Sequence, residues 1–488
     1  MSYFTELGHQ YIGGQWQVGS GSWDIIDFNP YNGEKLAAIT VATAKEIDAA
    51  YDAAARAQGA WADTDPWERR RIFERAIEVI EERTDEFAAL ITDELGGNQA
   101  KSVIELVSAI EHLRQAMVTT VEETTVCSPS PEPGRTNRVI RRPIGVVTVI
   151  SPFNFPLATA MMSVAPALAL GNAVVLKPNQ NSPVSGGGLV AKVLQEAGLP
   201  AGVLNVLVTD IAEIGDALIE HPVPSVISFA GSDEVGRHVA EVAARQLKRC
   251  VLQLSNNAAF VVLDDVRGER LDYAVRAAVS SRFVFQGQVC MAANRILVDQ
   301  AVADEFTEKF VAAVRALKVG DPRDPATHIG PLINALQADA MRTIIKQALD
   351  AGATALVQGS TYDNFVEPTV LTGLPEDSAL LRQEIFGPVA LLATFDGEEE
   401  AIRMANDTPY GLTAAVHTPD LERGARVARR IRAGMVHVNS TTNLQDVTVM
   451  FGGDGASGLG RLNGRHAIDL FSTEQWISTR ADMPEVPL

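Results

Sequence analysis

The sequence predicts an α/β protein with a mainly parallel sheet that carries helices on both faces, followed by a second α/β domain. Between residues 139 and 254, short apolar segments alternate with amphipathic helical segments, and this alternation is typical of parallel sheets. A second α/β run covers residues 260–439. The length of 488 residues allows for two to four structural units.

The elements are expected in the following order. Asp65 and Pro66 open a helix as N-cap and first residue, and Gly96-Gly97 stops it. Strands are expected at 139–150, 173–176, 203–207, 225–228 and 250–254, with helices at 156–170, 184–197, 211–219 and 234–244. Because ligands bind at the carboxyl ends of parallel strands, the residues that follow these strands are the candidates for a site.

Composition and charge exclude several classes of function. The net charge of −20 argues against a nucleic-acid or anionic-membrane binder. The three cysteines do not form a disulfide or zinc pattern, so no metal is expected. The sequence also lacks a signal-peptide pattern and an apolar run long enough to span a bilayer. We therefore expect a protein of the reducing cytoplasm.

The most informative motif is the segment FQGQVCMAANR at 285–295, which contains Cys290. A cysteine after a glycine-containing turn can present a thiolate to a cleft, where it attacks carbonyl groups. Taken alone, the pattern fits a buried, unreactive thiol better than a nucleophile.

Three further motifs follow expected strands. In SPFNFPL (151–157), Asn154 could donate to an oxyanion or cap the next helix. In NAVVLKPNQ (172–180), Lys177 suits a ribose or phosphate, or is simply solvated. In FAGSDEVG (229–236), Ser232 and the helix N-terminus could hold a pyrophosphate or form only a helix cap.

A fifth motif, QEIFGPV at 383–389, places a carboxylate beside an aromatic ring. Glu384 could hold ribose hydroxyls, and Phe386 could pack beside a nicotinamide. By itself the segment indicates only a loop.

In order and spacing, the five motifs together resemble those of the NAD(P)-dependent aldehyde dehydrogenase superfamily. The resemblance continues through YIGG (11–14), GLPAGVLN (198–205), FGG (451–453) and SGLGR (457–461), and so covers nearly the whole chain. Within the superfamily, the segment QGQVCM at 286–291 and the general character of the sequence are most similar to those of bacterial benzaldehyde and vanillin dehydrogenases. The resemblance implies a Rossmann-like cofactor domain (1–123 and 143–253), a catalytic domain (254–452) and a small β oligomerisation segment (124–142 and 471–488).

The same resemblance implies a role for each site residue. Cys290 would attack the aldehyde carbon and pass through a thiohemiacetal to a thioester, with Asn154 and the Cys290 N–H holding the oxyanion. Lys177 would hold the adenosine ribose, Ser232 the pyrophosphate and Glu384 the nicotinamide ribose, with Phe386 beside the nicotinamide. Further NAD or NADP contacts are expected at Pro152, Gln180, Gly231, Gly236 and Leu254, and the substrate pocket at Phe155, Met162 and Phe451.

The chain departs from the family at Gln253, where the family has a glutamate in the segment that reads QLSN here (253–256). In the family, that glutamate activates the water that hydrolyses the thioester. A neutral amide does not accept a proton, and loss of a general base costs about 10²–10⁴-fold. We therefore expect thioester formation to survive and deacylation to slow.

Three other departures concern the cofactor. Ser255 and Asn256 replace glycines and could crowd the nicotinamide. Asp233 and its neighbour Glu234 place carboxylates near the pyrophosphate site, where they would repel phosphate. Gln180 stands where NAD-selective members often carry glutamate, so NADP should be tolerated.

Three functions remain open at this point. The first is oxidation of an aldehyde, which could be aromatic, to a carboxylic acid. The second is transfer of the acyl group to coenzyme A, because the base is absent. The third is a binding or scaffold protein on a degenerate fold. A homodimer or homotetramer is expected by analogy, through strands near 124–142 and 471–480.

Overall fold

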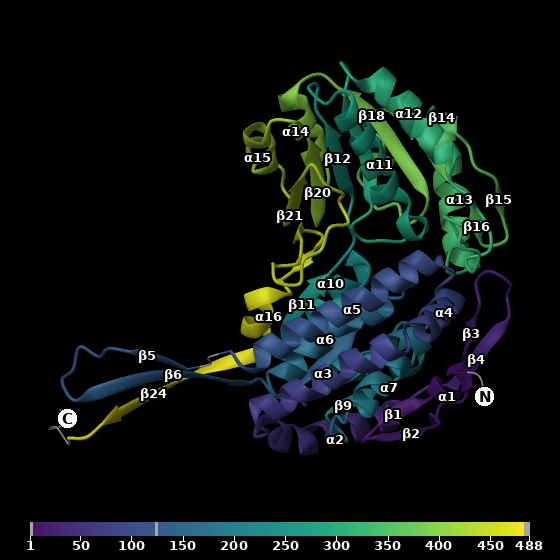
Figure 1. The fold of residues 1–488 in the computed structure, drawn as a ribbon. Coiled ribbons are helices and arrows are strands. Elements are labelled where there is room, and N and C mark those ends of the chain that lie inside the picture. Colours follow the sequence, from purple (N-terminus) through teal and green to yellow (C-terminus); the bar gives the residue numbers. More distant parts are fainter. Residues whose placement is uncertain (1–2, 123–124, 483–488) are drawn as a thin grey trace.

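The computed structural model describes residues 3–122 and 125–482, and these form two α/β bodies and a projecting arm (Figure 1). The first body is built on an eight-stranded sheet. In spatial order its strands are β2 (Gln15–Gln17), β1 (Gln10–Ile12), β9 (Leu204–Val206), β8 (Ala173–Lys177), β7 (Val146–Ile150), β10 (Pro224–Ala230), β11 (Arg249–Gln253) and β23 (Gly458–Leu459). The five strands from β9 to β11 are parallel. The strand order reverses beside β7, and this reversal is the point at which such sheets bind ligands.

Alternation of side chains along the central strands explains why both faces carry helices. On β8, Ala173 and Val175 pack in one apolar cluster with α2 (Ala44–Ala62), whereas Val174 and Leu176 pack in another with α6 (Pro156–Ala169). A strand buried on both faces reads as a continuous apolar run, as this segment does in the sequence. The other helices of this body are α1 (Tyr3–Leu7), α3 (Pro66–Glu82), α4 (Thr84–Leu95), α5 (Gln99–Thr120), α7 (Leu189–Glu196), α8 (Ile211–Ile214), α9 (Ala217–Glu220) and α10 (Asp233–Arg245).

The structure corrects three expected elements. The segment 139–150 is two strands in different sheets, because Gly145 takes a φ of 113° and turns the chain between β6 (Arg135–Pro143) and β7. The expected helix at 211–219 is the pair α8 and α9. The helix opened by Asp65 ends at Glu82, and a separate helix, α4, runs on to the left-handed Gly96.

The second body is a seven-stranded sheet that confirms the expected second α/β run. Its strands are, in spatial order, β14 (Thr354–Val357), β17 (Thr369–Thr372), β18 (Val389–Phe395), β13 (Ala293–Asp299), β12 (Ala258–Val262), β20 (Thr413–His417) and β21 (Met435–Val438). Its helices are α11 (Glu269–Phe283), α12 (Ala303–Arg315), α13 (Ala335–Asp350), α14 (Glu398–Asn406) and α15 (Leu421–Ala428). Short pairs complete the fold: β3 (Asp24–Phe28) with β4 (Lys35–Thr40), β15 (Thr361–Tyr362) with β16 (Phe365–Val366), and β19 (Tyr410–Gly411) with β22 (Asp454–Gly455).

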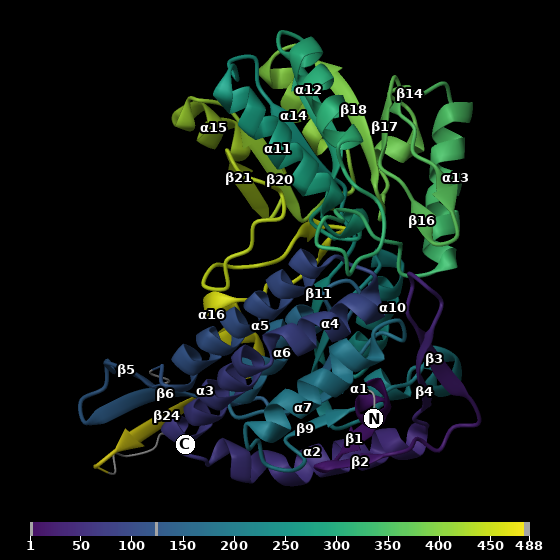
Figure 2. The ribbon, with the colours of Figure 1, turned by 45° about the vertical axis from the view of Figure 1, so that its right-hand side comes forward.

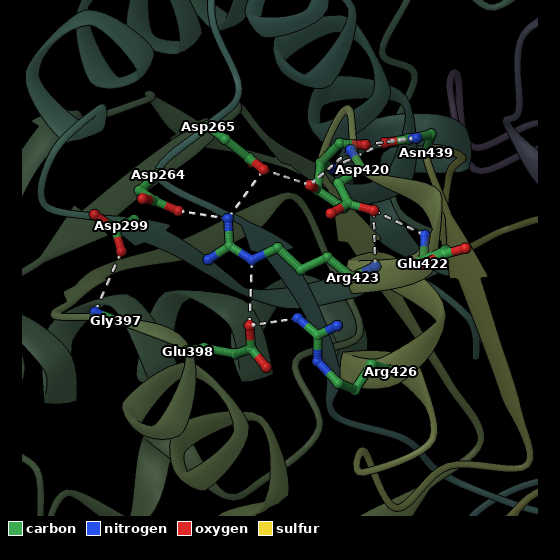
Figure 3. A network of polar contacts seen from close by, with 11 residues as sticks. Asp264, Asp265, Asp299, Gly397, Glu398, Asp420, Glu422, Arg423, Arg426 and Asn439 are labelled. Carbon is green, nitrogen blue, oxygen red and sulfur yellow. Dashed lines mark hydrogen bonds and ion pairs between the residues drawn. The ribbon is translucent and has the colours of Figure 1, made fainter.

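One arginine ties α15 to the rest of the second body (Figure 3). The Arg423 guanidinium lies 2.7 Å from Asp264 and 2.9 Å from Asp265, both just after β12. It also lies 3.2 Å from Glu398 at the start of α14. A network of several charges around one guanidinium holds an element more firmly than isolated surface pairs do.

The arm is a three-stranded antiparallel sheet of β24 (Ser472–Arg480), β6 and β5 (Thr125–Ser128). It extends away from both bodies, and α16 (Gly464–Phe471) leads into it (Figures 1 and 2). The pair of segments expected near 124–142 and 471–480 is therefore present as paired strands, although residues 123–124 and 483–488 lie outside the described residues. Within 3–122 and 125–482, none of the helices combines the length and the apolar character needed to cross a bilayer.

Candidate active site

A cavity of about 1350 Å³ opens where β7, β8, β10 and β11 end. Residues of the second body, among them Cys290 and Glu384, complete its wall. All but one of the residues predicted for the site line this cavity: Pro152, Asn154, Phe155, Met162, Lys177, Gln180, Gly231, Ser232, Gln253, Leu254, Cys290, Glu384, Phe386 and Phe451. Motifs that are far apart in the sequence thus meet at one place.

Gly236 is the exception: it does not line the cavity but packs against Leu254, which does. A Cβ atom at Gly236 would lie 2.3 Å from Cδ2 of Leu254. The glycine therefore lets α10 approach the strand end that carries Leu254, and Leu254 in turn lines the cavity.

The turn that presents Cys290 has an unusual backbone. Phe285, Gln286 and Gly287 all have left-handed φ values of 48°, 54° and 73°. For the two non-glycine residues this conformation costs roughly 1–2 kcal/mol each, so the surrounding structure must impose it.

Gln286 provides part of that constraint. Its buried Nε2 donates to the carbonyl of Gly96 at 2.9 Å and to that of Pro331 at 2.8 Å. A buried amide with two backbone acceptors fixes both its side chain and its own backbone.

Arg282 provides the rest of the constraint. Its buried guanidinium donates to the carbonyl of Gly287 at 2.8 Å and to that of Ile385 at 3.1 Å. Burial lowers the pKa of Arg282 to about 9, while the charge of Glu384 opposes the shift. Arg282 thus joins the turn before Cys290 to the loop that carries Glu384.

Cys290 is a thiol rather than a thiolate at neutral pH in this structure. Burial raises the pKa of Cys290 to about 12, and the charge of Glu384 adds to the shift, although backbone N–H groups oppose it. A more positive environment would be needed to release the proton.

Asn154 is not the helix cap that the sequence left open. The helix α6 begins at Pro156 with Phe155 in the cap position and without a capping side chain. Asn154 is buried and lines the cavity, and among the described residues its amide has no hydrogen-bond partner. The amide N–H groups are therefore available to a ligand.

Gln253 ends β11 and is 8 % exposed. Neither its Nε2 nor its Oε1 has a hydrogen-bond partner among the described residues. A buried amide with two unpaired atoms is unfavourable by itself, and here it belongs to a residue that lines the cavity.

Glu384 contacts Asn256, one of the two residues that replace the family's glycines. Its Oε1 accepts from the N–H of Asn256 at 2.9 Å. Burial raises the pKa of Glu384 to about 7, although hydrogen bonds from Asn256 and Ser255 and the charge of Arg282 oppose the shift. The carboxylate is thus held by the segment in which side chains replace the family's glycines.

Ser255 and Asn256, which replace the family's glycines, differ in whether they line the cavity. Ser255 lines the cavity and is the one that can crowd a ligand. Asn256 does not, because its Oδ1 accepts from Leu412 N–H at 3.3 Å. Asp233 also does not line the cavity, and it contacts Tyr410 Oη at 3.3 Å and Arg237 Nη2 at 3.6 Å. The Arg237 contact partly compensates the negative charge of Asp233.

The residues at the strand ends fit a dinucleotide. Ser232 caps α10 by accepting from Val235 N–H at 3.3 Å, and its hydroxyl still lines the cavity. Within the described part of the chain, the Lys177 side chain makes a single long hydrogen bond, from Nζ to Pro178 O at 3.4 Å. Burial lowers the pKa of Lys177, while Asp210 opposes the shift. A helix N-terminus, a hydroxyl and a lightly bound ammonium are suitable donors for phosphate and ribose.

Aromatic and sulfur-containing side chains also line the cavity. Phe155, Met162 and Phe451 line it, and Phe153 packs edge-on against Phe386 with ring centroids 5.9 Å apart. Among the described residues of the lining, Lys177 is the only lysine or arginine. Apart from Lys177, the described lining therefore has no lysine or arginine that could pair with a carboxylate group on a substrate.

Sequence reasoning missed Arg282, Gln286 and Phe153. Arg282 and Gln286 are fully buried polar groups that support Cys290 from behind, and a motif search for chemistry does not select such groups. The one signal in the sequence was that polar residues are dense around the apolar residues of the Cys290 motif. An exposed loop shows the same pattern.

Comparisons with known proteins agree with this geometry. The chain matches the aldehyde dehydrogenase family over residues 16–477. It is 46 % identical over 487 residues to a benzaldehyde dehydrogenase of Bacillus subtilis, covering 100 % of both chains. It is 42 % identical to a vanillin dehydrogenase of Corynebacterium glutamicum, covering 96 % of this chain and 97 % of the relative.

A solved structure of an NAD-dependent benzaldehyde dehydrogenase from Corynebacterium glutamicum superposes with a TM-score of 0.89. The match has 40 % identity and covers 98 % of this chain and 97 % of that chain. The family resemblance drawn from the motifs, and its narrower likeness to benzaldehyde and vanillin dehydrogenases, are thus confirmed. This chain therefore belongs to the aldehyde dehydrogenase family and is an NAD(P)-dependent enzyme that oxidises an aldehyde to a carboxylic acid.

Proposed function

We propose that Cys290 is the nucleophile and that Asn154 and the Cys290 N–H stabilise the oxyanion. The observation that carries this proposal is the shared cavity: the thiol and an unpaired amide face the same space. The sulfur bonds to the aldehyde carbon, the thiol proton passes to solvent water, and the carbonyl oxygen takes up negative charge beside the Asn154 amide. A nicotinamide cofactor would supply the hydride acceptor, and loss of hydride from this carbon would leave an acyl group on Cys290 as a thioester.

The dinucleotide site belongs to the first body, which residues 1–123 and 143–253 largely form. Lys177 holds the adenosine ribose, and Gln180 lies beside it on the exposed side of the cavity. Gly231 and Ser232 bind the pyrophosphate at the start of α10. Pro152 and Leu254 line the path between them, and Gly236 supports Leu254.

The nicotinamide end lies against residues 254–452. Phe386 would flank the ring, and Glu384, whose Oε1 accepts from the Asn256 N–H, would hold the ribose. Burial raises the pKa of Glu384 to about 7, and a hydroxyl donor from the ribose would favour its charged form.

Deacylation is the slow half of the reaction in this proposal. Gln253 lines the cavity and stands where the family has its glutamate base, but an amide does not remove a proton from water. Transfer of the acyl group to the thiol of coenzyme A is a second candidate function, because a thiol attacks a thioester more readily than water does. The absent base at Gln253 is the observation that favours it.

The preferred substrate is a neutral aromatic aldehyde. Phe155, Met162 and Phe451 offer apolar walls, and apart from Lys177 the described lining of the cavity has no lysine or arginine, which disfavours aldehydes that carry a carboxylate. The names of the relatives in Bacillus subtilis and Corynebacterium glutamicum point the same way.

The arm is proposed as an oligomerisation surface in a cytoplasmic homodimer or homotetramer. Trp476 and Val126 on the arm are 67 % and 62 % exposed, and large apolar side chains in a projecting sheet are expected to be covered by a partner.

The central test is stopped-flow measurement of NAD(P)H formation with benzaldehyde. Cys290→Ala should abolish the first turnover, and Cys127→Ala, which removes an exposed thiol on β5, should leave it unchanged. Asn154→Ala should slow it by about 10²–10³-fold. A first turnover that survives in Cys290→Ala would refute the nucleophile.

A further inference from the structure

A fully buried ion pair lies behind the site, on α5. Lys101 and Glu105 are one helical turn apart, with side chains 1 % and 0 % exposed, and their charged atoms are 2.5 Å apart. Moving two charges out of water costs several kcal/mol per ion before their attraction is counted. Such a pair is weak support for stability, and both of its members make further contacts.

Glu105 holds the start of α6. Its Oε1 accepts from the N–H of Leu157 at 2.8 Å and, more weakly, from that of Ala158 at 3.5 Å. These donors are in the first turn of the helix, where a carboxylate is favoured by the helix dipole. Because Asn154 precedes this turn directly, Glu105 fixes the place from which Asn154 reaches the cavity.

Lys101 contacts both segments that carry the proposed chemistry. Its Nζ lies 4.5 Å from the ring centroid of Phe155 and 4.5 Å from that of Phe285. The two rings themselves meet edge to face, with centroids 5.9 Å apart. Phe155 is the neighbour of Asn154, and Phe285 is the first left-handed residue of the turn before Cys290. One ammonium therefore connects the two segments through two cation–π contacts.

A close approach at Gly97 makes this arrangement possible. A Cβ atom there would lie 2.8 Å from the Phe285 ring and 3.1 Å from Cδ of Lys101. The glycine thus lets the ring and the lysine stem occupy the space beside α5. Neither Lys101 nor Glu105 lines the cavity, so they do not touch a substrate.

We infer that Lys101 is a positioning residue, whose buried ammonium, paired with Glu105 and enclosed by Phe155 and Phe285, sets the spacing between the Asn154 amide and the Cys290 thiol. The inference rests on the roles proposed above for Asn154 and Cys290. Only a step that needs both groups at once should depend on this spacing, and attack on the aldehyde carbonyl is that step.

The experiment compares Lys101→Met with the double variant Lys101→Met/Glu105→Gln. Lys101→Met removes the ammonium but leaves a buried, unpaired carboxylate, so a loss of melting temperature is expected. In the double variant no unpaired charge remains, and the amide oxygen still accepts from Leu157. The double variant should therefore regain much of the melting temperature.

The first turnover separates positioning from stability. A misplacement of about 1 Å costs on the order of 10²-fold in rate, so both variants should show a slow first turnover with benzaldehyde at saturating NAD. The dissociation constant for NAD, measured by calorimetry, should stay at the wild-type value, as should alkylation of Cys290 by iodoacetamide, which does not use Asn154. Lys192→Met, which removes ion pairs to Glu6 and Glu196 on the surface, is the matched control and should leave the first turnover unchanged.

Two results would overturn the inference. A wild-type first turnover in the double variant would show that Lys101 only stabilises the fold, and a rate loss matched by an equal loss of NAD affinity would show a general distortion. The proposed function is tested separately, because a first turnover that persists in Cys290→Ala would overturn the nucleophile and with it this role of Lys101.

Discussion

Replacing Gln253 with glutamate should raise the steady-state rate of aldehyde oxidation, which deacylation limits in the wild-type chain. Both amide atoms of Gln253 are unpaired, so Gln253→Glu breaks no hydrogen bond, and the change in size is small. A positioned general base is worth about 10²–10⁴-fold, which corresponds to about 2.7–5.4 kcal/mol of the barrier to deacylation. We expect the lower end near pH 7, about 10²-fold, because burial raises the pKa of a new carboxyl group at this position and leaves part of it protonated.

The assay follows NAD(P)H absorbance by stopped flow with benzaldehyde. The wild-type chain should release one equivalent of NAD(P)H per Cys290 and then turn over slowly. Gln253→Glu should keep the first equivalent and raise the steady rate, with a further rise as pH increases and the new carboxyl group loses its proton.

Gln253→Leu is the matched control, since it removes the amide without adding a base. Its steady rate should equal that of the wild type. If Gln253→Glu turns over no faster than the wild type, another group already serves as the base and the reasoning about position 253 is wrong. Acceleration of the wild type by coenzyme A would instead identify acyl transfer as the natural second half-reaction.

Three further predictions follow from the cofactor site, the thiol and a buried carboxyl pair. Values of kcat/KM with NAD and NADP should be comparable, and Gln180→Glu should shift the preference to NAD; a wild-type preference of about 10³-fold or more for NAD would contradict this. Alkylation of Cys290 in the free protein, taken as the difference from Cys290→Ala, should be slow at pH 7 and still rising at pH 10, because burial raises the pKa of the thiol to about 12; a plateau near pH 8 would refute it. Burial raises the pKa of Glu94 to about 7 and that of its hydrogen-bonded neighbour Asp27 well above 3.8, so this pair stabilises the fold fully at low pH and loses that contribution as pH rises through about 7. Asp27→Asn, whose amide replaces the shared proton, should make the urea midpoint less dependent on pH than in the wild type, and an equal dependence would exclude the shared proton.

The strand ends were predictable, because their chemistry is local. Lys177 and Ser232 each follow an apolar run that reads as a buried strand, and parallel strands bring their carboxyl ends to one edge. The outcome at Asn154 was not predictable in this way, since an asparagine before a proline fits a helix cap as well as an oxyanion donor. Only the placement of Phe155 at the cap position separates the two.

The buried residues that support the site from behind could not be predicted from the sequence. Lys101 and Glu105 read as an exposed i,i+4 pair on an amphipathic helix, and Gln286 as a polar loop residue. Their burial depends on contacts with segments distant in the chain, such as the Pro331 carbonyl for Gln286. The left-handed backbone at Phe285 also lacks a local signal, because a bulky residue is disfavoured there and is held by those same distant contacts.

The pairing of β24 with β6 constrains the order in which the chain can finish folding during its synthesis. β6 leaves the ribosome before the sheet of the second body has begun, whereas β24, its partner over nine residues, follows that entire body. Until β24 emerges, one edge of β6 presents unpaired N–H and C=O groups, as does the edge of β11 that β23 later covers. A nascent chain therefore carries an open edge at β6 while most of its length is made, and a second at β11 while the second body is made. Such edges are templates for pairing with other chains. The emergence of β23 covers β11, and that of β24 then covers β6.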